Sequence, residues 1–229
     1  MKITVLIPAY NEHETILEII QRAKLALEEY EHEIIVIDDA SQDSTVEIAG
    51  SEPGVKVMVL DQHQGKGAAL KQGLAVAQGE IIIIQDADLE YDPSDYPVLL
   101  KPILQQGAKV VYGSRILGAK AGKPVGISNW RFYWGGRLLS WLTSLLYKVK
   151  LTDESTGYKV FLTEVLKQCD WSAKGFDFCP EVTAKLLKKN IDIVEVPISY
   201  MPRTFIEGKK ISWQDGWQAI KVLVKQRFT

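Results

Sequence analysis

Three carboxylates, Asp86, Asp88 and Glu90, are spaced two residues apart and follow directly after the four isoleucines at 81–84. Alternate residues of an extended segment point to the same side, so the three acids are expected to face one cleft. Acids at this spacing lie about 6.6 Å apart along a strand, so we expect one to hold a metal while another serves a different group. Oxygen-only ligands suit Mg²⁺ or Mn²⁺ and disfavour zinc.

The same stretch has a simpler interpretation as an acidic turn before a helix. Asp92 and Asp95 would then stabilise the first helical turn near Pro93. This interpretation accounts for those two residues. It does not account for three further acids at the end of a buried strand, so we favour a functional role for Asp88.

Apolar runs alternate with helical patterns over the first half of the chain. The runs predicted to form strands are 3–8, 33–39, 55–60, 80–86 and 108–114. Nearly continuous apolar strands joined by helices indicate an α/β fold, with a doubly wound, mostly parallel sheet over about residues 1–115. The first helix is expected to take Asn11 as its N-cap, with Glu14 three residues later.

The pattern changes after residue 115. The predicted elements are an aromatic helix at about 129–147, a helix near 180–189, a strand at 192–200 and a C-terminal helix. No repeat or low-complexity linker separates the halves. Residues 1–229 are therefore expected to form a single domain with an elaborated C-terminal half.

Composition excludes several classes of protein. A formal net charge of -2 and no overall basic field argue against a nucleic-acid binder. The 2 cysteines are too few for a disulfide framework and favour a reducing compartment. The N-terminus has a short apolar run typical of a first strand and not of a signal peptide, and no run approaches the roughly 18 apolar residues of a membrane span.

Polar residues collect where the predicted strands end, which is where open α/β sheets bind ligands. The first of these loops, "PAYNEHE", contains no glycine, so it is not a dinucleotide-binding turn. The segment "GKGAA" at 65–69 is too short for a P-loop. Two interpretations stay open for it: a helix start with permissive glycines, or a phosphate contact that includes Lys66.

The motifs, in chain order, resemble those of the family-2 glycosyltransferases with a GT-A fold. They are "PAYNE", "DDASQDST", "GKGAA", "DADLEYDP", "GSR", "TGYKVF", and "EVPISYMPR" with "EGKKI". Within that family they are most similar to the polyprenyl-phosphate (dolichyl-phosphate) mannose or glucose synthases. The resemblance covers about residues 2–212 and implies a nucleotide-sugar-binding half, 1–115, followed by an acceptor-side half, 116–229.

The resemblance implies a pocket for the nucleobase and ribose. Its residues would be Pro8, Tyr10, Glu12, Ile37 and Asp39. A carboxylate that accepts from base N–H groups or ribose hydroxyls is the chemical reason for Glu12 and Asp39. The neighbouring Asp38 is open to a structural role instead.

Within the acidic motif, the resemblance assigns Asp86 and Ala87 to the nucleotide, and Asp88 to a metal that bridges the donor diphosphate. Glu90 stands where many polyprenyl-phosphate mannose synthases have Gln. It keeps an oxygen ligand and adds a charge, so we expect it as a second metal ligand and leave the donor open.

The expected mechanism follows from charge. Negative charge grows on the β-phosphate when a sugar leaves a nucleotide diphosphate, and a divalent ion with nearby cations stabilises it. The cations expected there are Arg115, Arg203 and one of the two lysines Lys209 and Lys210.

The acceptor decides whether a base is needed. A lipid phosphate is already an anion, whereas a sugar hydroxyl requires a general base. Asp153 is the best candidate for that base and Asp177 the next. For each, a loop Asp that bonds its own backbone is an equal alternative.

The aromatic helix bears on the acceptor. Its apolar face is expected to carry Trp134, Leu138, Trp141, Leu142 and Leu145. Aromatics interspersed with cations are typical of an interfacial helix, and packing on the sheet is the even alternative. Two apolar faces would indicate a second contact, with lipid or with another subunit.

Three functions of different kinds follow. We favour an inverting, metal-dependent transfer of a hexose to a polyprenyl phosphate, with the protein peripheral at the cytoplasmic face of a membrane; inversion is implied by the resemblance alone. Transfer to a sugar hydroxyl of a polysaccharide or glycolipid is the alternative within that class. A phosphohydrolase would carry D-x-D on its first strand, and the intact acidic motif argues against an inactive binding protein.

Overall fold

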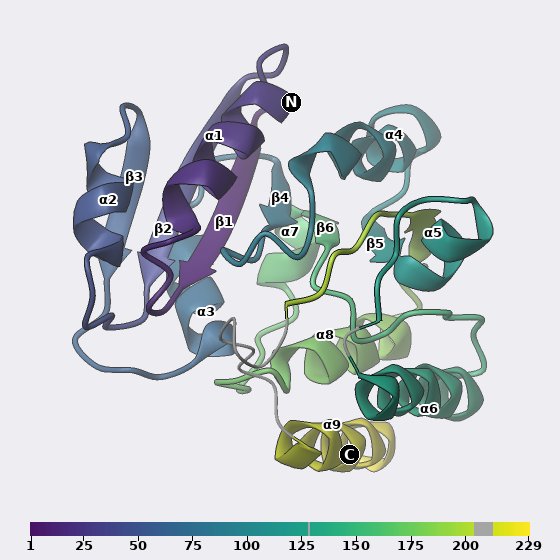
Figure 1. Ribbon diagram of the computed structural model, residues 1–229. Helices are drawn as coiled ribbons and strands as arrows, with labels where there is room; N and C mark the ends of the chain where they lie inside the picture. Colours follow the sequence, from purple (N-terminus) through teal and green to yellow (C-terminus); the bar gives the residue numbers. More distant parts are fainter. Residues whose placement is uncertain (128, 204–212) are drawn as a thin grey trace.

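The computed structural model describes residues 1–127, 129–203 and 213–229 (Figure 1). Its strands are β1 (Ile3–Ala9), β2 (His32–Asp38), β3 (Val55–Val59), β4 (Ile81–Ile84), β5 (Val110–Ser114), β6 (Lys159–Leu162) and β7 (Val194–Pro197). Its helices are α1 (Ile16–Ala26), α2 (Thr45–Ser51), α3 (Lys66–Val76), η1 (Pro93–Asp95), α4 (Tyr96–Gln106), α5 (Arg115–Lys120), α6 (Trp130–Tyr147), α7 (Thr163–Lys167), α8 (Phe178–Lys188) and α9 (Trp213–Phe228). The predicted strands and the aromatic helix are confirmed.

One seven-stranded sheet runs through the molecule in the order β3-β2-β1-β4-β6-β5-β7. All neighbouring strands are parallel except β6, which is antiparallel to both β4 and β5. The mostly parallel α/β sheet is confirmed, but residues 1–115 do not complete it. The strand β6 comes from the second half of the chain and separates β4 from β5.

Helices cover both faces of this sheet and explain the isoleucine run. Ile81 and Ile83 belong to the core beneath α1 and α4, whereas Ile82 and Ile84 belong to the core beneath α3 and α8. All four side chains are at most 1% exposed. Because both faces of β4 are packed, its carboxyl end is a fixed platform for the loop that follows.

A further layer lies outside α8, where α6 and α9 run side by side (Figure 1). Leu139 of α6 and Ala219 and Leu223 of α9 pack with Ala184 of α8. Asn129 caps α6 by accepting a hydrogen bond from the backbone N of Arg131 at 2.8 Å.

The prediction that Asn11 caps the first helix is wrong. The helix α1 begins at Ile16, and Asn11 has a left-handed backbone with φ 50. Its side chain instead accepts from the backbone N of Gln42 at 2.8 Å, while its own N donates to Ser41 Oγ at 2.9 Å. These bonds between two loops take the place of a helix cap.

Candidate active site

The acidic loop after β4 is a turn and not an extended segment. The strand ends at Ile84, and Leu89 has a left-handed φ of 60. The expected face of three equally spaced carboxylates is therefore wrong in its geometry, although Asp86, Asp88 and Glu90 remain more exposed than Ala87. The buried Gln85 fixes the start of the turn, because its Oε1 accepts from the hydroxyls of Tyr96 and Tyr158 at 2.8 and 2.7 Å.

Asp86 forms an ion pair with Lys66 at the start of α3. Burial alone would lower the pKa of Lys66, but the adjacent Asp86 charge raises it above its ordinary value. Gly157 lies against the same carboxylate: a Cβ there would overlap Asp86 Oδ2 and stand 2.7 Å from Tyr91 Cε2. The glycine of "TGYKVF" is thus one point at which the second half of the chain touches the acidic loop.

Asp88 lies among more negative than positive charge. Its Oδ1 accepts from the backbone N of Glu90 at 3.1 Å, and its Oδ2 is 3.3 Å from Arg203 Nη2. Burial, together with the charges of Asp86 and Glu90, raises the pKa of Asp88 to about 7 despite the attraction of Arg203. This carboxylate would gain from a further cation.

Glu90 binds the segment that follows β7. Its Oε2 accepts from Tyr200 Oη and its Oε1 from the backbone N of Arg203, both at 2.7 Å. Its carbonyl accepts from the backbone N of Met201 at 2.9 Å. The carboxylate and the carbonyl of Glu90 therefore link the acidic loop to residues 200–203.

Arg203 returns across the site to the first loop. Its Nη1 and Nη2 donate to the two carboxylate oxygens of Glu12 at 2.9 and 3.1 Å. Glu12 is buried, and its backbone N donates to Thr45 Oγ1 at 2.9 Å. One guanidinium thus joins the loops after β1 and β4, as their place at the same sheet edge predicts.

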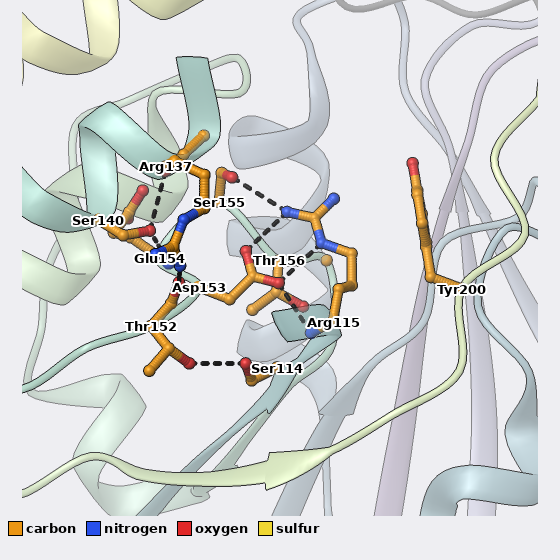
Figure 2. A network of polar contacts seen from close by, with 12 residues as sticks. Ser114, Arg115, Arg137, Ser140, Thr152, Asp153, Glu154, Ser155, Thr156 and Tyr200 are labelled. Atoms are coloured by element: carbon orange, nitrogen blue, oxygen red, sulfur yellow. Dashed lines mark hydrogen bonds and ion pairs between the residues drawn. The ribbon is translucent and has the colours of Figure 1, made fainter. Parts of the chain in front are cut away.

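Arg115 and Asp153 form a second, closely paired unit (Figure 2). Arg115 donates from Nε and Nη2 to the Asp153 carboxylate at 2.7 Å each, and from its backbone N at 2.9 Å. Its Nη2 also reaches Ser155 Oγ at 3.1 Å, and Tyr200 lies over the guanidinium at 4.9 Å. Burial would lower the pKa of Arg115, but Asp153 raises it well above its usual value. The geometry favours Asp153 as an orienting partner of Arg115.

Glu195 of β7 is a residue that the sequence reasoning missed. Its carboxylate accepts from the backbone N and hydroxyl of Thr152 at 2.7 and 2.9 Å, and from the backbone N of Asp153 at 2.9 Å. It thereby fixes the loop that holds Arg115. A glutamate inside the apolar run "DIVEVP" was the only signal in the sequence.

Of the residues expected to bind the nucleobase and ribose, Pro8 and Tyr10 are partly exposed, whereas Ile37 and Asp39 are buried. Tyr10 stacks on His63 with ring centroids 4.1 Å apart, and Pro8 is partly exposed at the end of β1. Ile37 is fully buried and packs against Gly73 of α3. Asp39 accepts from the backbone N of Gln64 and Gly65 at 2.8 and 2.6 Å, so its carboxylate shapes the loop after β3.

Two further acids have structural partners. Asp38 accepts from the backbone N of Ser41 at 2.8 Å, which agrees with the structural role left open for it. Asp177 accepts from the backbone N of Gly175 at 3.0 Å, the local bond expected for a loop Asp.

The start of α3 is covered by the chain itself. The backbone N of Ala68 donates to the carbonyl of Lys174 at 3.0 Å, and a Cβ on Gly65 would stand 2.7 Å from that carbonyl. Of the two interpretations of "GKGAA", the helix start with permissive glycines therefore fits best. Lys66 points to Asp86, and Lys209 and Lys210 lie outside the described residues.

The acids before α4 differ in role. Asp92 accepts from the backbone N of Ser94 at 2.9 Å and begins η1, as expected. Asp95 does not cap the helix. It is buried, pairs with Lys123 and accepts from the backbone N of Ser199 at 2.6 Å, because a buried carboxylate needs partners that an exposed cap does not.

A divalent metal fits the donor chemistry at Asp88. Within the described residues no three His, Cys, Asp or Glu side chains are already grouped around a metal-sized space. Asp88 and Glu90 would supply the protein oxygens, and Mg²⁺ and Mn²⁺ commonly take their remaining ligands from water and phosphate. Burial and the charges of Asp86 and Glu90 disfavour the ionised form of Asp88, and a bound cation would offset that cost.

The helix α6 has two apolar faces. One packs on α8 and α9, whereas the other leaves five large side chains 51–62% exposed: Trp130, Trp134, Leu138, Trp141 and Leu145. Leu142, expected on the exposed face, is half-buried. Among the described residues, none of the helices combines the length and the apolar character needed to cross a bilayer.

Comparison with known proteins identifies the class. The profile of Glycosyl transferase family 2 matches residues 4–169, so the chain belongs to this family and is a glycosyltransferase. Solved structures share its GT-A fold. Glucosyl-3-phosphoglycerate synthase of Mycobacterium tuberculosis, bound to uridine diphosphate, superposes with a TM-score of 0.78 at 21% identity over 99% of this chain and 80% of that one.

Relatives of known name lie nearer in sequence. A dolichol-phosphate mannosyltransferase of Pyrococcus furiosus is 32% identical over 91% of this chain and 59% of its own length. A hexosyltransferase of low-salt glycan biosynthesis from Haloferax volcanii is 30% identical over 97% of this chain and 53% of its own. This chain thus spans little more than half of those two. An undecaprenyl-phosphate mannosyltransferase of Micrococcus luteus is 30% identical over 91% of this chain and 87% of its own.

Proposed function

We propose that the protein transfers a hexose from a nucleotide sugar, of the GDP-mannose or UDP-glucose type, to a polyprenyl phosphate. The observation that carries this proposal is the placing of two arginines near the acidic loop: Arg203 lies 3.3 Å from Asp88, and Arg115 contacts the ring of Tyr200, whose hydroxyl bonds Glu90. The names of the polyprenyl-phosphate mannosyltransferases among its relatives support the acceptor class.

The residues would act on charge. Asp88 and Glu90 would hold Mg²⁺ or Mn²⁺, which offsets the charge of the donor diphosphate. Arg203, and Arg115 with one orientation fixed by Asp153, would stabilise the negative charge that grows on the leaving phosphate. Asp86 and Lys66 would position the nucleotide.

The state of Asp153 supports a phosphate acceptor over a sugar hydroxyl. Its carboxylate accepts three hydrogen bonds from Arg115, so both of its oxygens are already bonded to that cation. A phosphate oxygen attacks as an anion and needs no base. A phosphate acceptor therefore fits a site in which the candidate base is already bonded to Arg115.

Binding and transfer assays test the proposal. Nucleoside diphosphates and nucleotide sugars with Mn²⁺ or Mg²⁺ are expected to raise the melting temperature, and the best donor to support transfer to a short polyprenyl phosphate. Asp88→Asn is the matched variant. No stabilisation by any nucleotide diphosphate, or equal stabilisation of Asp88→Asn, would contradict the assignment.

The exposed face of α6 supports a peripheral position at the cytoplasmic face of a membrane. Residues 130–150 contain the cations Arg131, Arg137, Lys148 and Lys150 and no acid, which suits an anionic surface. Liposome flotation of the double variant Trp134→Glu with Leu138→Glu is expected to be weaker than that of the unaltered protein. Leu25→Glu with Val59→Glu, at exposed apolar positions on α1 and β3, is the control; equal flotation of both double variants would reject the α6 face.

A further inference from the structure

The guanidinium of Arg203 lies beside the Asp88 carboxylate, which would also attract a metal ion. Its Nη2 is 3.3 Å from Asp88 Oδ2, while both of its terminal nitrogens bond Glu12. The Arg203 side chain is 17% exposed, so these contacts are largely shielded from water. An ion pair at this depth is stronger than one on the surface.

The backbone of Arg203 is fixed by the acidic loop itself. Glu90 accepts from the backbone N of Arg203 and from Tyr200 Oη at 2.7 Å each. Because Glu90 is only two residues from Asp88, the loop that would bind a metal also holds the arginine beside it. The guanidinium can therefore shift locally while its backbone stays in place.

The hydrogen bonds of Arg203 are incomplete. Its Nε is buried and has no hydrogen-bond partner among the described residues, although its other nitrogens are well used. A buried donor without a partner carries a free-energy cost, so a hydrogen bond from Nε to a new acceptor would be favourable.

Asp88 has a different cation from its neighbour in the acidic loop. Asp86 is paired with Lys66, whereas Asp88 Oδ2 lies 3.3 Å from Arg203 Nη2. A metal placed at Asp88 would repel the guanidinium that now contacts the same carboxylate.

We propose that Arg203 is the resident counter-cation of the metal position: it neutralises Asp88 in the metal-free protein and is displaced from that carboxylate when a divalent ion binds. It then keeps Glu12 and turns its freed nitrogens to the donor diphosphate. This inference rests on the proposed function, because it takes Asp88 as the metal ligand. Metal and Arg203 compete for Asp88 until a diphosphate gives the arginine a new partner.

Mn²⁺ affinity in the absence of nucleotide tests the competition without measuring transfer. Arg203→Met removes the charge and keeps much of the apolar stem, so it is expected to bind Mn²⁺ about tenfold more tightly by calorimetry or by electron paramagnetic resonance. The same variant is expected to bind a nucleoside diphosphate with Mn²⁺ more weakly. Glu12→Gln is the matched control, because Arg203 keeps Asp88 as its acid and Mn²⁺ should bind no more tightly than to the unaltered protein.

Folding is controlled by a second variant. Arg203→Met removes the two hydrogen bonds that Arg203 donates to the buried Glu12. The double variant Glu12→Gln with Arg203→Met removes both charges and is expected to show the same tighter Mn²⁺ binding. Unchanged or weaker Mn²⁺ binding in this double variant, while Asp88→Asn loses the metal, would overturn the role of Arg203 alone. Unchanged Mn²⁺ binding in Asp88→Asn would overturn the metal assignment and this inference with it.

Discussion

Arg115 and Arg203 both reach the candidate site, but their partners differ. Arg115 has one carboxylate, Asp153, which accepts three of its hydrogen bonds at 2.7 to 2.9 Å, and that carboxylate lies in a loop fixed by Glu195. Arg203 contacts Glu12 and Asp88 with its side chain, and its Nε has no partner among the described residues.

This difference separates a rigid cation from an exchangeable one. Arg115 binds one carboxylate through its backbone N, Nε and Nη2 and is held in a single orientation, which suits a group that must wait in position for a developing charge. A guanidinium shared between two acids can give up one of them at lower cost. Arg115, at the start of α5, therefore supplies the fixed positive charge, and Arg203, in the segment after β7, supplies the adjustable one.

Asp153→Asn is expected to have the largest effect, because it breaks the rigid pair. The Asp153 side chain is 5% exposed, and its loss as an anion leaves Arg115 without its main partner. Removing one member of such a buried pair costs about 3 kcal/mol of folding free energy. Urea unfolding measures this loss, and transfer activity should fall with it.

Asp170→Asn is the control for that substitution. Asp170 forms a 3.0 Å ion pair with Lys71, but its side chain is 88% exposed. Surface pairs contribute little, so no measurable change is expected. If both variants lost the same stability, the buried Arg115–Asp153 pair would contribute no more to folding than the exposed Lys71–Asp170 pair.

Gly157→Ala tests the contact between the two halves and should have the second largest effect. A Cβ would overlap Asp86 Oδ2 and press on Tyr91, so the acidic loop must move. Overpacking of this kind costs about 2 kcal/mol. Nucleotide affinity, measured by calorimetry, should fall, whereas Mn²⁺ affinity at Asp88 should fall less. Unchanged affinity for the nucleotide would show that Asp86 tolerates the shift.

Local patterns predicted most of the fold, and long-range pairing explains what they missed. The apolar runs predicted the strands of the first half because each strand carries its apolar pattern within its own few residues. The insertion of β6 between β4 and β5 depends on partners about 80 and 50 residues away in the chain, and "KVFL" carries no sign of its direction. Asn11 was misassigned for the same reason, since its bonds go to Ser41 and Gln42.

The order of the motifs proposed the residues of the candidate site but not their pairing. Asp88 lies 3.3 Å from Arg203, whereas Asp86 pairs with Lys66 and Arg115 with Asp153. Their ion pairs could not be read from spacing, because Arg203 lies 191 residues from Glu12. The bond from Ser199 to Asp95 was missed because the two residues are 104 apart in the chain.

Asp88→Asn changes one of the two acids that Arg203 contacts and should stabilise the metal-free protein. The pKa of Asp88 rises from 3.8 to about 7 on folding, so the folded state holds this proton more tightly than the unfolded chain. Ionised Asp88 therefore opposes folding, increasingly as pH rises from about 4 to about 7. In EDTA the variant should gain about 1–2 kcal/mol at pH 8 and less at pH 5. A gain that is independent of pH would place the titration elsewhere.

Gly135→Ala is expected to have the smallest effect and to leave both arginines untouched. Gly135 is exposed on α6, and a Cβ there meets nothing within 4 Å. Alanine is favoured over glycine inside a helix by about 0.5–1 kcal/mol, so thermal unfolding should shift upward by roughly 1–4 °C. Affinities for Mn²⁺ and nucleotide should not change, because neither Arg115 nor Arg203 contacts this side of α6. A change in either affinity would show that the site responds to the global stability of the domain, and the rigid and adjustable arginines would then have to be compared at matched stability.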